Sequence, residues 1–241
     1  MKITEKLKRK QDSMFGTAPV TIAFLGDSVT QGCFECYKKT SDAIETVFDY
    51  SRAYSSRLRE MLNTLYPNVQ INIINSGLSG DSAHRGYERF DRDITPYSPD
   101  LVIVGYALND ACCGERYIGR YRDAIRGILK KVGDIGAECI LLTPNMMATH
   151  TSCHLTDKTM TDLSEKFASV QNGGVLDAYV AAEKEIATEL GIKICDVYSR
   201  WMAMANSGVD ITEMLANKLN HPIRQLHYMT AYLLCECIMG L

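Results

Sequence analysis

Five short apolar runs along the chain predict buried strands. They cover residues 20–25, 69–74, 101–105, 139–142 and 193–195, and each is rich in Val, Ile or Leu without strict alternation with polar residues. Strands of a parallel sheet that are covered on both faces have this pattern. The runs therefore favour a sheet at the centre of the molecule.

Apolar residues at helical spacing occupy segments between these runs. They predict helices over 52–66, 115–132, 176–190 and 223–238, with Pro67 ending the first and Gly191 capping the third. Alternating strands and helices form right-handed βαβ units, so we expect an α/β fold with a five-stranded parallel sheet. No internal repeat or linker-like change of composition interrupts the sequence, which predicts a single domain over residues 1–241.

Two long segments, 31–50 and 145–172, show neither pattern. Both follow the ends of predicted strands, so we expect irregular loops that overhang the carboxyl edge of the sheet. Loops of such length in a compact domain usually carry function.

Charge and cysteine content narrow the possible partners and the compartment. The 241 residues include 26 basic and 29 acidic side chains, and a net charge of -3 gives no electrostatic reason to expect nucleic acid. The basic cluster at 6–10 is typical of a solvated N-terminal turn. We expect neither a membrane span nor a signal peptide, because no apolar stretch is long enough. Nine irregularly spaced cysteines then favour reduced thiols and a cytoplasmic location.

Small polar motifs follow the first three strands and precede the last helix. They are Gly26-Asp27-Ser28, Ser79-Gly80-Asp81, Gly105 with Asn109-Asp110, and His221-Pro222. A serine hydroxyl becomes a useful nucleophile when it has a base beside it and donors for the oxyanion. Carboxyl ends of parallel strands share one edge, so these groups can converge there. Taken singly, each motif also fits an ordinary turn, flexible loop or helix cap.

The four motifs together resemble those of the SGNH hydrolase superfamily, the GDSL-type esterases and lipases. The resemblance runs from about residue 20 to 222 and implies a flavodoxin-like three-layer α/β/α sandwich. It implies that Ser28 is the nucleophile and His221 the base. It also implies oxyanion donors at the Ser28 N–H, the Gly80 N–H and the Asn109 side chain.

One position departs from the family pattern. The family usually has an Asp three residues before the histidine, and this chain has Lys218 there. A lysine cannot accept a hydrogen bond from the imidazole. We consider three substitutes: the Asn217 side chain, a backbone carbonyl within 217–219, or Asp210 from upstream. A Ser–His dyad oriented by a carbonyl keeps the right tautomer but stabilises imidazolium less well.

Cysteines and other side chains near the expected site need no cofactor to explain them. Cys33, Cys36, Cys112, Cys113 and Cys153 lie in loops at the same sheet edge, but their spacing is not that of a zinc site. We expect no metal and no cofactor. Several further residues are placed either to line a pocket or to pack in the core: Glu35, Tyr37, Tyr106, Met146, Met147 and His150.

These observations predict a serine ester hydrolase that forms an acyl-enzyme. The resemblance implies a small-molecule substrate, either an acetylated sugar or another short acyl ester. An acyl-thioesterase or lysophospholipase of the same superfamily is one alternative. A non-catalytic binding protein on this scaffold is another, motivated by the missing Asp. A nucleotide-binding or flavin-binding protein fits less well, because Asp27 stands where a phosphate would bind.

Overall fold

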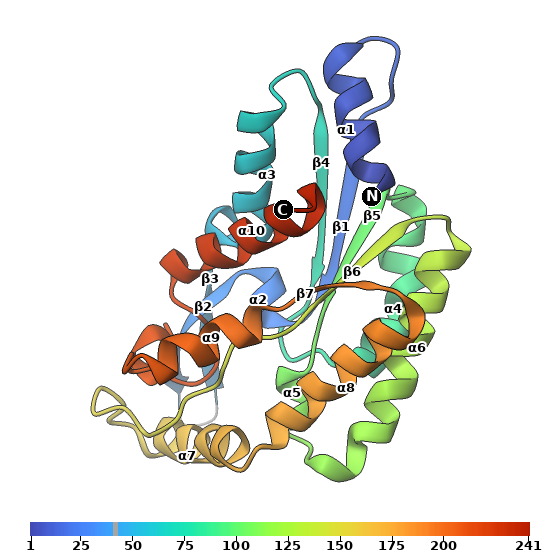
Figure 1. Cartoon of the computed structure of the whole chain (residues 1–241). Coiled ribbons are helices and arrows are strands. Elements are labelled where there is room, and N and C mark those ends of the chain that lie inside the picture. The colour runs from blue at the N-terminus through green and yellow to red at the C-terminus, as the bar shows by residue number, and fades with distance from the viewer. Residues whose placement is uncertain (41–42) are drawn as a thin grey trace.

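A parallel sheet forms the centre of the computed structural model, which describes residues 1–40 and 43–241 (Figure 1). In that part of the chain the sheet has five strands in the order β4-β1-β5-β6-β7. This is the order of flavodoxin-like doubly wound folds. The strands are β1 (Val20–Gly26), β4 (Ile71–Gly77), β5 (Leu101–Gly105), β6 (Glu138–Leu142) and β7 (Lys193–Cys195). All five predicted strands are confirmed, with ends that shift by up to three residues.

Helices cover both faces of this sheet, which confirms the expected three-layer α/β/α sandwich (Figure 1). One layer holds α1 (Lys2–Asp12), α3 (Tyr54–Leu65) and α10 (Arg224–Met239). The opposite layer holds α4 (Ala83–Asp93), α6 (Ile118–Asp134) and α8 (Val175–Leu190). The four predicted helices correspond to α3, α6, α8 and α10. The strands need cover on both faces because almost every side chain of β1 and β5 is buried.

The basic N-terminal segment is a helix, so the prediction of a solvated turn was wrong. Ile3 and Leu7 of α1 are buried in the core, at a spacing that the surrounding charges conceal in the sequence. Lys10 is also buried, and its ammonium donates to the backbone carbonyls of Met14 and Thr17. One cation of the cluster therefore closes the connection between α1 and β1.

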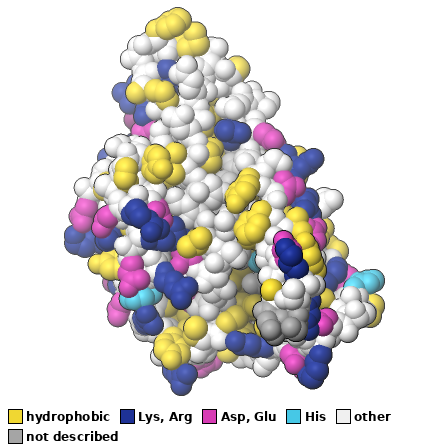
Figure 2. Space-filling model, turned by 180° about the vertical axis from the view of Figure 1, so that it is seen from behind, with side chains coloured by type: hydrophobic (Ala, Val, Ile, Leu, Met, Phe, Trp, Pro, Cys, Tyr) yellow, Lys and Arg dark blue, Asp and Glu magenta, His cyan; other side chains and the backbone are white. Residues whose placement is uncertain are grey.

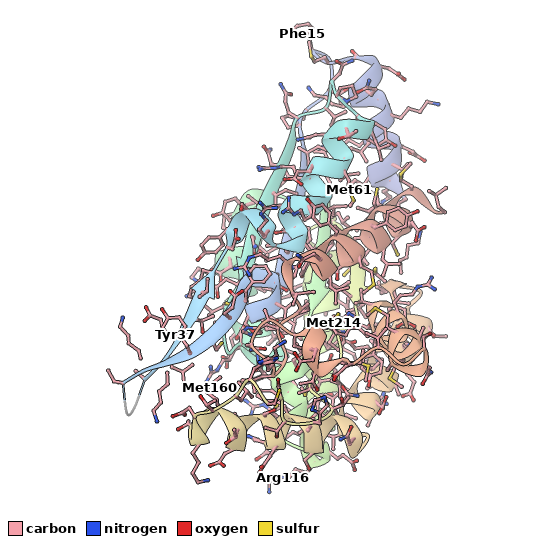
Figure 3. The ribbon with its side chains drawn as sticks, turned by 90° about the vertical axis from the view of Figure 1, so that its left-hand side faces the viewer. Phe15, Tyr37, Met61, Arg116, Met160 and Met214 are labelled. Carbon is pink, nitrogen blue, oxygen red and sulfur yellow. The ribbon has the colours of Figure 1, made fainter. Side chains whose placement is uncertain are left out.

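Both segments expected to be irregular contain regular structure. The first holds an antiparallel pair, β2 (Cys33–Thr40) and β3 (Ala43–Phe48), which we call the β2–β3 ladder. Positions 41–42 of that segment lie outside the described residues. The second holds α7 (Lys158–Asn172), which Asp157 caps through its side chain. In Figure 3 the ladder, with Tyr37 labelled, projects beside α7, on which Met160 is labelled. The expectation that both segments are irregular was wrong. Much of the ladder is exposed, and α7 is a mostly polar helix with few apolar residues to reveal it.

Three strands end at the same level where the site begins. In the strand register Gly26 of β1 pairs with Gly77 of β4 and with Gly105 of β5. A Cβ atom at Gly77 would lie 2.2 Å from the backbone nitrogen of Gln31, so a larger residue would push the chain after β1 away. The loops that follow β1, β4 and β5 therefore leave the sheet side by side.

The surface carries charges of both signs. On the described part of the face in Figure 2, basic and acidic side chains are interspersed and no broad area of one sign is visible. Among the described residues, no helix combines the length and the hydropathy that crossing a bilayer requires.

Candidate active site

Ser28 lies at the start of a short helix directly after β1. This helix, α2 (Ser28–Gln31), is capped by Asp27, whose carboxylate accepts a hydrogen bond from the Val29 N–H at 2.9 Å. The Ser28 Oγ atom lies 2.9 Å from Nε2 of His221. Both side chains are almost fully buried, with 3% of Ser28 and 5% of His221 exposed. The structure thus brings these two predicted residues into direct contact.

The second nitrogen of the His221 ring fixes its tautomer. Nδ1 lies 2.9 Å from the backbone carbonyl oxygen of Phe34, in β2. A carbonyl can only accept, so Nδ1 carries the proton and donates to Phe34. Nε2 then presents its lone pair to Ser28, whose hydroxyl donates to it. Burial lowers the pKa of His221 to about 4, although the hydrogen bond to Phe34 acts in the opposite direction. The imidazole is therefore neutral at pH 7 and can accept a proton.

The partner of the His221 ring is a backbone carbonyl, but none of the three predicted groups. Asn217 Oδ1 accepts hydrogen bonds from the backbone N–H groups of Leu219, Asn220 and His221, at 2.9 to 3.0 Å. Asn217 therefore shapes the turn that presents His221 and leaves the ring alone. The ring instead meets a segment far away in the sequence, which local spacing could not indicate.

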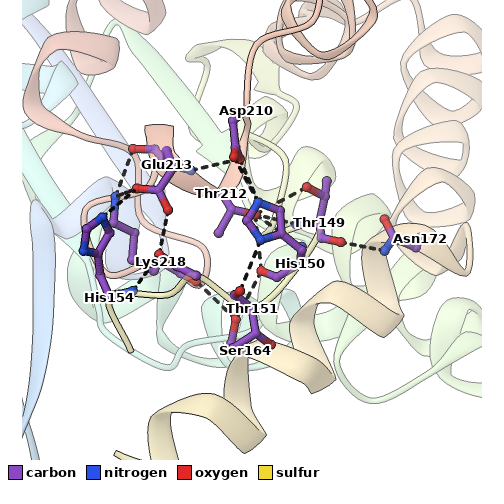
Figure 4. Close-up of polar contacts among 11 residues, drawn as sticks. Thr149, His150, Thr151, His154, Ser164, Asn172, Asp210, Thr212, Glu213 and Lys218 are labelled. Carbon is purple, nitrogen blue, oxygen red and sulfur yellow. Dashed lines mark hydrogen bonds and ion pairs between the residues drawn. The ribbon is translucent and has the colours of Figure 1, made fainter. Parts of the chain in front are cut away.

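Asp210 and Lys218 are both engaged elsewhere (Figure 4). The Asp210 carboxylate lies 3.0 Å from Nε2 of His150, and this contact raises the pKa of the His150 imidazole. Lys218 has a left-handed backbone, with φ of 58°, and its ammonium donates to the Glu213 carboxylate at 2.7 Å. The proposal of Asp210 as an orienting group was wrong because its carboxylate binds His150.

Gly80 lies in the loop after β4, and Asn109 lies in a short helix after β5. The Asn109 Nδ2 group donates to the backbone carbonyl of Asp81 at 2.8 Å, which ties the loop after β5 to the loop that carries Gly80. Gly80 has φ of 74°, a conformation that favours glycine. Ala107 also has a positive φ, 97°, just before the helix α5 (Leu108–Ala111) that carries Asn109. Backbone strain of this kind is common at functional sites.

Buried acidic residues and Arg89 form a cluster that supports these loops. Asp81 accepts a hydrogen bond from Nε of Arg89 at 2.8 Å, and the same guanidinium donates to the Gly26 carbonyl at 3.0 Å. Burial raises the pKa of Asp27 to about 7 and that of Asp110 to about 6. Sequence reasoning missed Arg89 because α4, which carries it, was not predicted. An arginine three residues after a glycine and between acidic residues gives no signal by itself.

Four of the other residues singled out from the sequence either pack in the core or line a surface pocket. Tyr106, Met146 and Met147 are buried and pack in the core. Tyr37 is exposed and lines a surface pocket of about 510 Å³ between the β2–β3 ladder and the start of α7, together with Cys36. The Cys36 sulfur also lies 4.0 Å from Nδ1 of His221. Within residues 1–40 and 43–241, no group of three or more His, Cys, Asp or Glu side chains is arranged to hold a metal ion.

The chain belongs to the GDSL-like Lipase/Acylhydrolase family, which matches residues 24–227. It is 23% identical, over 132 residues, to an acetylxylan esterase from Geobacillus stearothermophilus, and the match covers 51% of this chain and 58% of that protein. Its fold is similar to that of a lipase/acylhydrolase from Enterococcus faecalis, with a TM-score of 0.65, 16% identity, and coverage of 92% of this chain and 96% of that one.

A two-domain esterase active on acetylated mannans is also similar, with a TM-score of 0.64 and 18% identity. That comparison covers 98% of this chain and 52% of the esterase. The chain thus spans a little over half the length of this esterase, and its match to the Geobacillus enzyme spans a similar share of that protein.

Proposed function

We propose that this protein is a serine ester hydrolase that removes acetyl or other short acyl groups from a carbohydrate or a small ester. The observation that carries the proposal is the 2.9 Å contact between Ser28 Oγ and Nε2 of a neutral, buried His221. A hydroxyl beside a base of this form is the arrangement that nucleophilic catalysis needs.

In the proposed reaction Ser28 Oγ attacks the ester carbonyl while its proton passes to Nε2 of His221. The tetrahedral oxyanion collapses, the bond to the alcohol breaks, and Nε2 returns the proton to the departing oxygen. Water then attacks the acyl-enzyme with the same base and releases the acid. The Phe34 carbonyl holds the ring throughout, and its partial negative charge stabilises the transient imidazolium less than a carboxylate would.

The oxyanion donors in this scheme are the Ser28 N–H, the Gly80 N–H and the Asn109 amide. One Nδ2 hydrogen of Asn109 is used by the Asp81 carbonyl at 2.8 Å, which leaves the other for substrate. A donor whose direction is fixed before the reaction stabilises the transition state without reorganisation.

The relatives support the choice of substrate class. One is an acetylxylan esterase and another is active on acetylated mannans. We therefore propose acetylated oligosaccharides as the first substrates to test. We also propose that the protein works in the cytosol, since its nine cysteines are all unpaired and a reducing compartment keeps thiols in that state.

The test is steady-state hydrolysis of p-nitrophenyl esters from acetate to palmitate, followed by acetate release from acetylated xylo-oligosaccharides and manno-oligosaccharides. Turnover that is highest with acetate, extends to the sugars and disappears in Ser28→Ala supports the proposal. A maximum with long acyl chains would instead favour a lipase or thioesterase. No turnover dependent on Ser28 with any ester would contradict the proposal and favour a binding protein.

A further inference from the structure

Arg224 lies where the loop that carries His221 meets the β2–β3 ladder. It is the first residue of α10, three positions after His221. Its guanidinium forms a two-pronged contact with the Glu35 carboxylate, in which Nη2 donates to Oε2 at 2.9 Å. Its Nε donates to the Asp49 carboxylate at 3.1 Å. Glu35 belongs to β2 and Asp49 directly follows β3, so one side chain ties both strands to the start of α10.

The same guanidinium also packs on the residue that orients the base. Its central carbon lies 4.3 Å from the centre of the Phe34 ring. The ring also packs against His227, one turn further along α10, with ring centroids 4.8 Å apart. Phe34 is fully buried. Both ends of the hydrogen bond between Phe34 and His221 are therefore attached to the first turn of α10.

A backbone carbonyl depends on such support more than a carboxylate does. An aspartate side chain can rotate to follow the ring, whereas a carbonyl moves only with its strand. The ladder that carries it has two strands, and most of its side chains beyond Phe34 are partly or fully exposed. Such a pair of strands is marginally stable by itself. Ion pairs to a planar guanidinium, which fits a carboxylate with two parallel hydrogen bonds, fix both distance and direction.

We propose that Arg224 is a positioning residue that holds the β2–β3 ladder so that the Phe34 carbonyl stays in line with Nδ1 of His221. This inference rests on the proposed function, in which His221 is the base. The Phe34 carbonyl, which Arg224 holds in place through the strand, orients the ring as an aspartate beside the histidine does in the family pattern.

The main experiment compares Arg224→Ala and Arg224→Lys with the wild type on p-nitrophenyl acetate. A misplacement of about 1 Å can cost about 100-fold in rate, so we expect kcat to fall about 10- to 100-fold in Arg224→Ala with KM little changed. Lysine keeps the charge but not the planar fork, so Arg224→Lys should recover part of the loss. Arg126→Ala is the control, because Arg126 is similarly exposed and pairs with Glu189 at 2.7 Å on the opposite helix layer. It should retain wild-type kcat.

A second readout follows the ring itself and needs no turnover. Nitrogen-15 NMR of histidine-labelled protein, with the His221 signal assigned by its loss in His221→Gln, should show a single tautomer protonated at Nδ1 in the wild type. Arg224→Ala should show a mixture of tautomers. Glu35→Gln, which leaves the arginine in place, keeps the inference testable if Arg224→Ala does not fold. It should shift kcat and the tautomer in the same direction by a smaller factor.

The outcomes separate the two proposals. A folded Arg224→Ala protein that keeps both the wild-type kcat and the single Nδ1–H tautomer would overturn the role of Arg224 and leave the serine mechanism in place. If only Glu35→Gln folds, the same two results in that variant would overturn the role. A rise in KM with kcat unchanged would assign Arg224 to substrate binding and would also overturn its positioning role. Failure of the proposed function looks different, because Ser28→Ala would then hydrolyse the ester as fast as the wild type.

Discussion

Ser28, directly after β1, and Phe34 of the β2–β3 ladder contact the two ring nitrogens of His221. The end of β1, which lies beside the ends of β4 and β5, and the ladder are built in different ways. The strand ends belong to a sheet covered by helices on both faces, and their loops are linked to one another by backbone contacts such as that of Leu78 N–H with the Gly26 carbonyl. The ladder is exposed along much of its length and is joined to α10 through side chains. Ser28 is thus fixed by local chain geometry, whereas the Phe34 carbonyl is fixed by contacts between residues about 190 positions apart.

A site can therefore lack a residue typical of its family and keep the geometry that this residue would provide. A carboxylate close to the histidine in sequence is replaced by a carbonyl from a distant strand, and the long-range ion pairs at Arg224 then carry the orientation.

Replacing the nucleophile has the largest expected effect. Ser28→Ala should lower kcat for p-nitrophenyl acetate by about 10⁴-fold or more, because the remaining donors cannot replace the attacking oxygen. The melting temperature should stay close to that of the wild type, as the change removes one oxygen atom. Ser207→Ala, at an exposed position after α9 (Val197–Asn206), serves as the control and should be fully active. A Ser28→Ala protein with substantial turnover would contradict the mechanism.

Removing an oxyanion donor at the end of the sheet should have the second-largest effect on kcat. Asn109→Ala removes a neutral donor and the hydrogen bond to Asp81, and kcat should fall about 10²- to 10³-fold. Stopped-flow and steady-state rates on p-nitrophenyl acetate measure the loss. Asn72→Ala is a suitable comparison, because that amide is exposed and donates to Thr21 Oγ1 at the other end of β4 and β1. Equal activity in the two variants would exclude Asn109 as a donor.

The buried acid beneath the nucleophile predicts a pH-dependent stability. Burial raises the pKa of Asp27 from 3.8, its value in the unfolded chain, to about 7. The free energy of unfolding therefore falls as the pH rises from 3.8 towards 7, because the folded state disfavours the carboxylate. Asp27→Asn removes this cost. Its gain in the free energy of unfolding should therefore be absent near pH 4 and grow steadily as the pH rises to 7.

Urea unfolding at pH 5 and pH 8 measures this difference. The exposed Asp162→Asn, whose wild-type carboxylate pairs with Lys158 at 2.8 Å, should show little change between the two pH values. An Asp27→Asn protein that is no more stable at pH 8 than at pH 5, relative to the wild type, would contradict the raised pKa.

Restoring the family residue should have the smallest effect. Lys218→Asp places a carboxylate at the usual position, but the side chain there faces Glu213 and Nδ1 of His221 is already bonded to Phe34. We expect kcat within about two-fold of the wild type, and Lys218→Asn separates the loss of the ion pair from the new charge. A ten-fold rise in kcat for Lys218→Asp alone would mean that position 218 can reach the ring.

The sequence indicated the sheet and its strand ends much better than the β2–β3 ladder. Short runs rich in Val, Ile or Leu predicted all five sheet strands, because strands packed under helices leave an apolar pattern that neighbouring residues reveal. Ser28, Gly80 and Asn109 could be assigned to one edge for the same reason. The polar segment that became β2 and β3 carried no such period, and the contact of Phe34 with His221 spans most of the chain. Neither α1 nor the link from Arg224 to Glu35 and Asp49 could be predicted, since charged residues hid the first and tertiary structure creates the second.

Covalent trapping of the nucleophile examines the Ser28–His221 dyad itself. Incubation with a fluorophosphonate, followed by intact-protein mass spectrometry and peptide mapping, should give one adduct per chain, located on Ser28. The adduct should be absent in Ser28→Ala and should form far more slowly in His221→Gln. An adduct on another residue, or labelling of Ser28 at an unchanged rate without His221, would contradict the Ser28–His221 dyad.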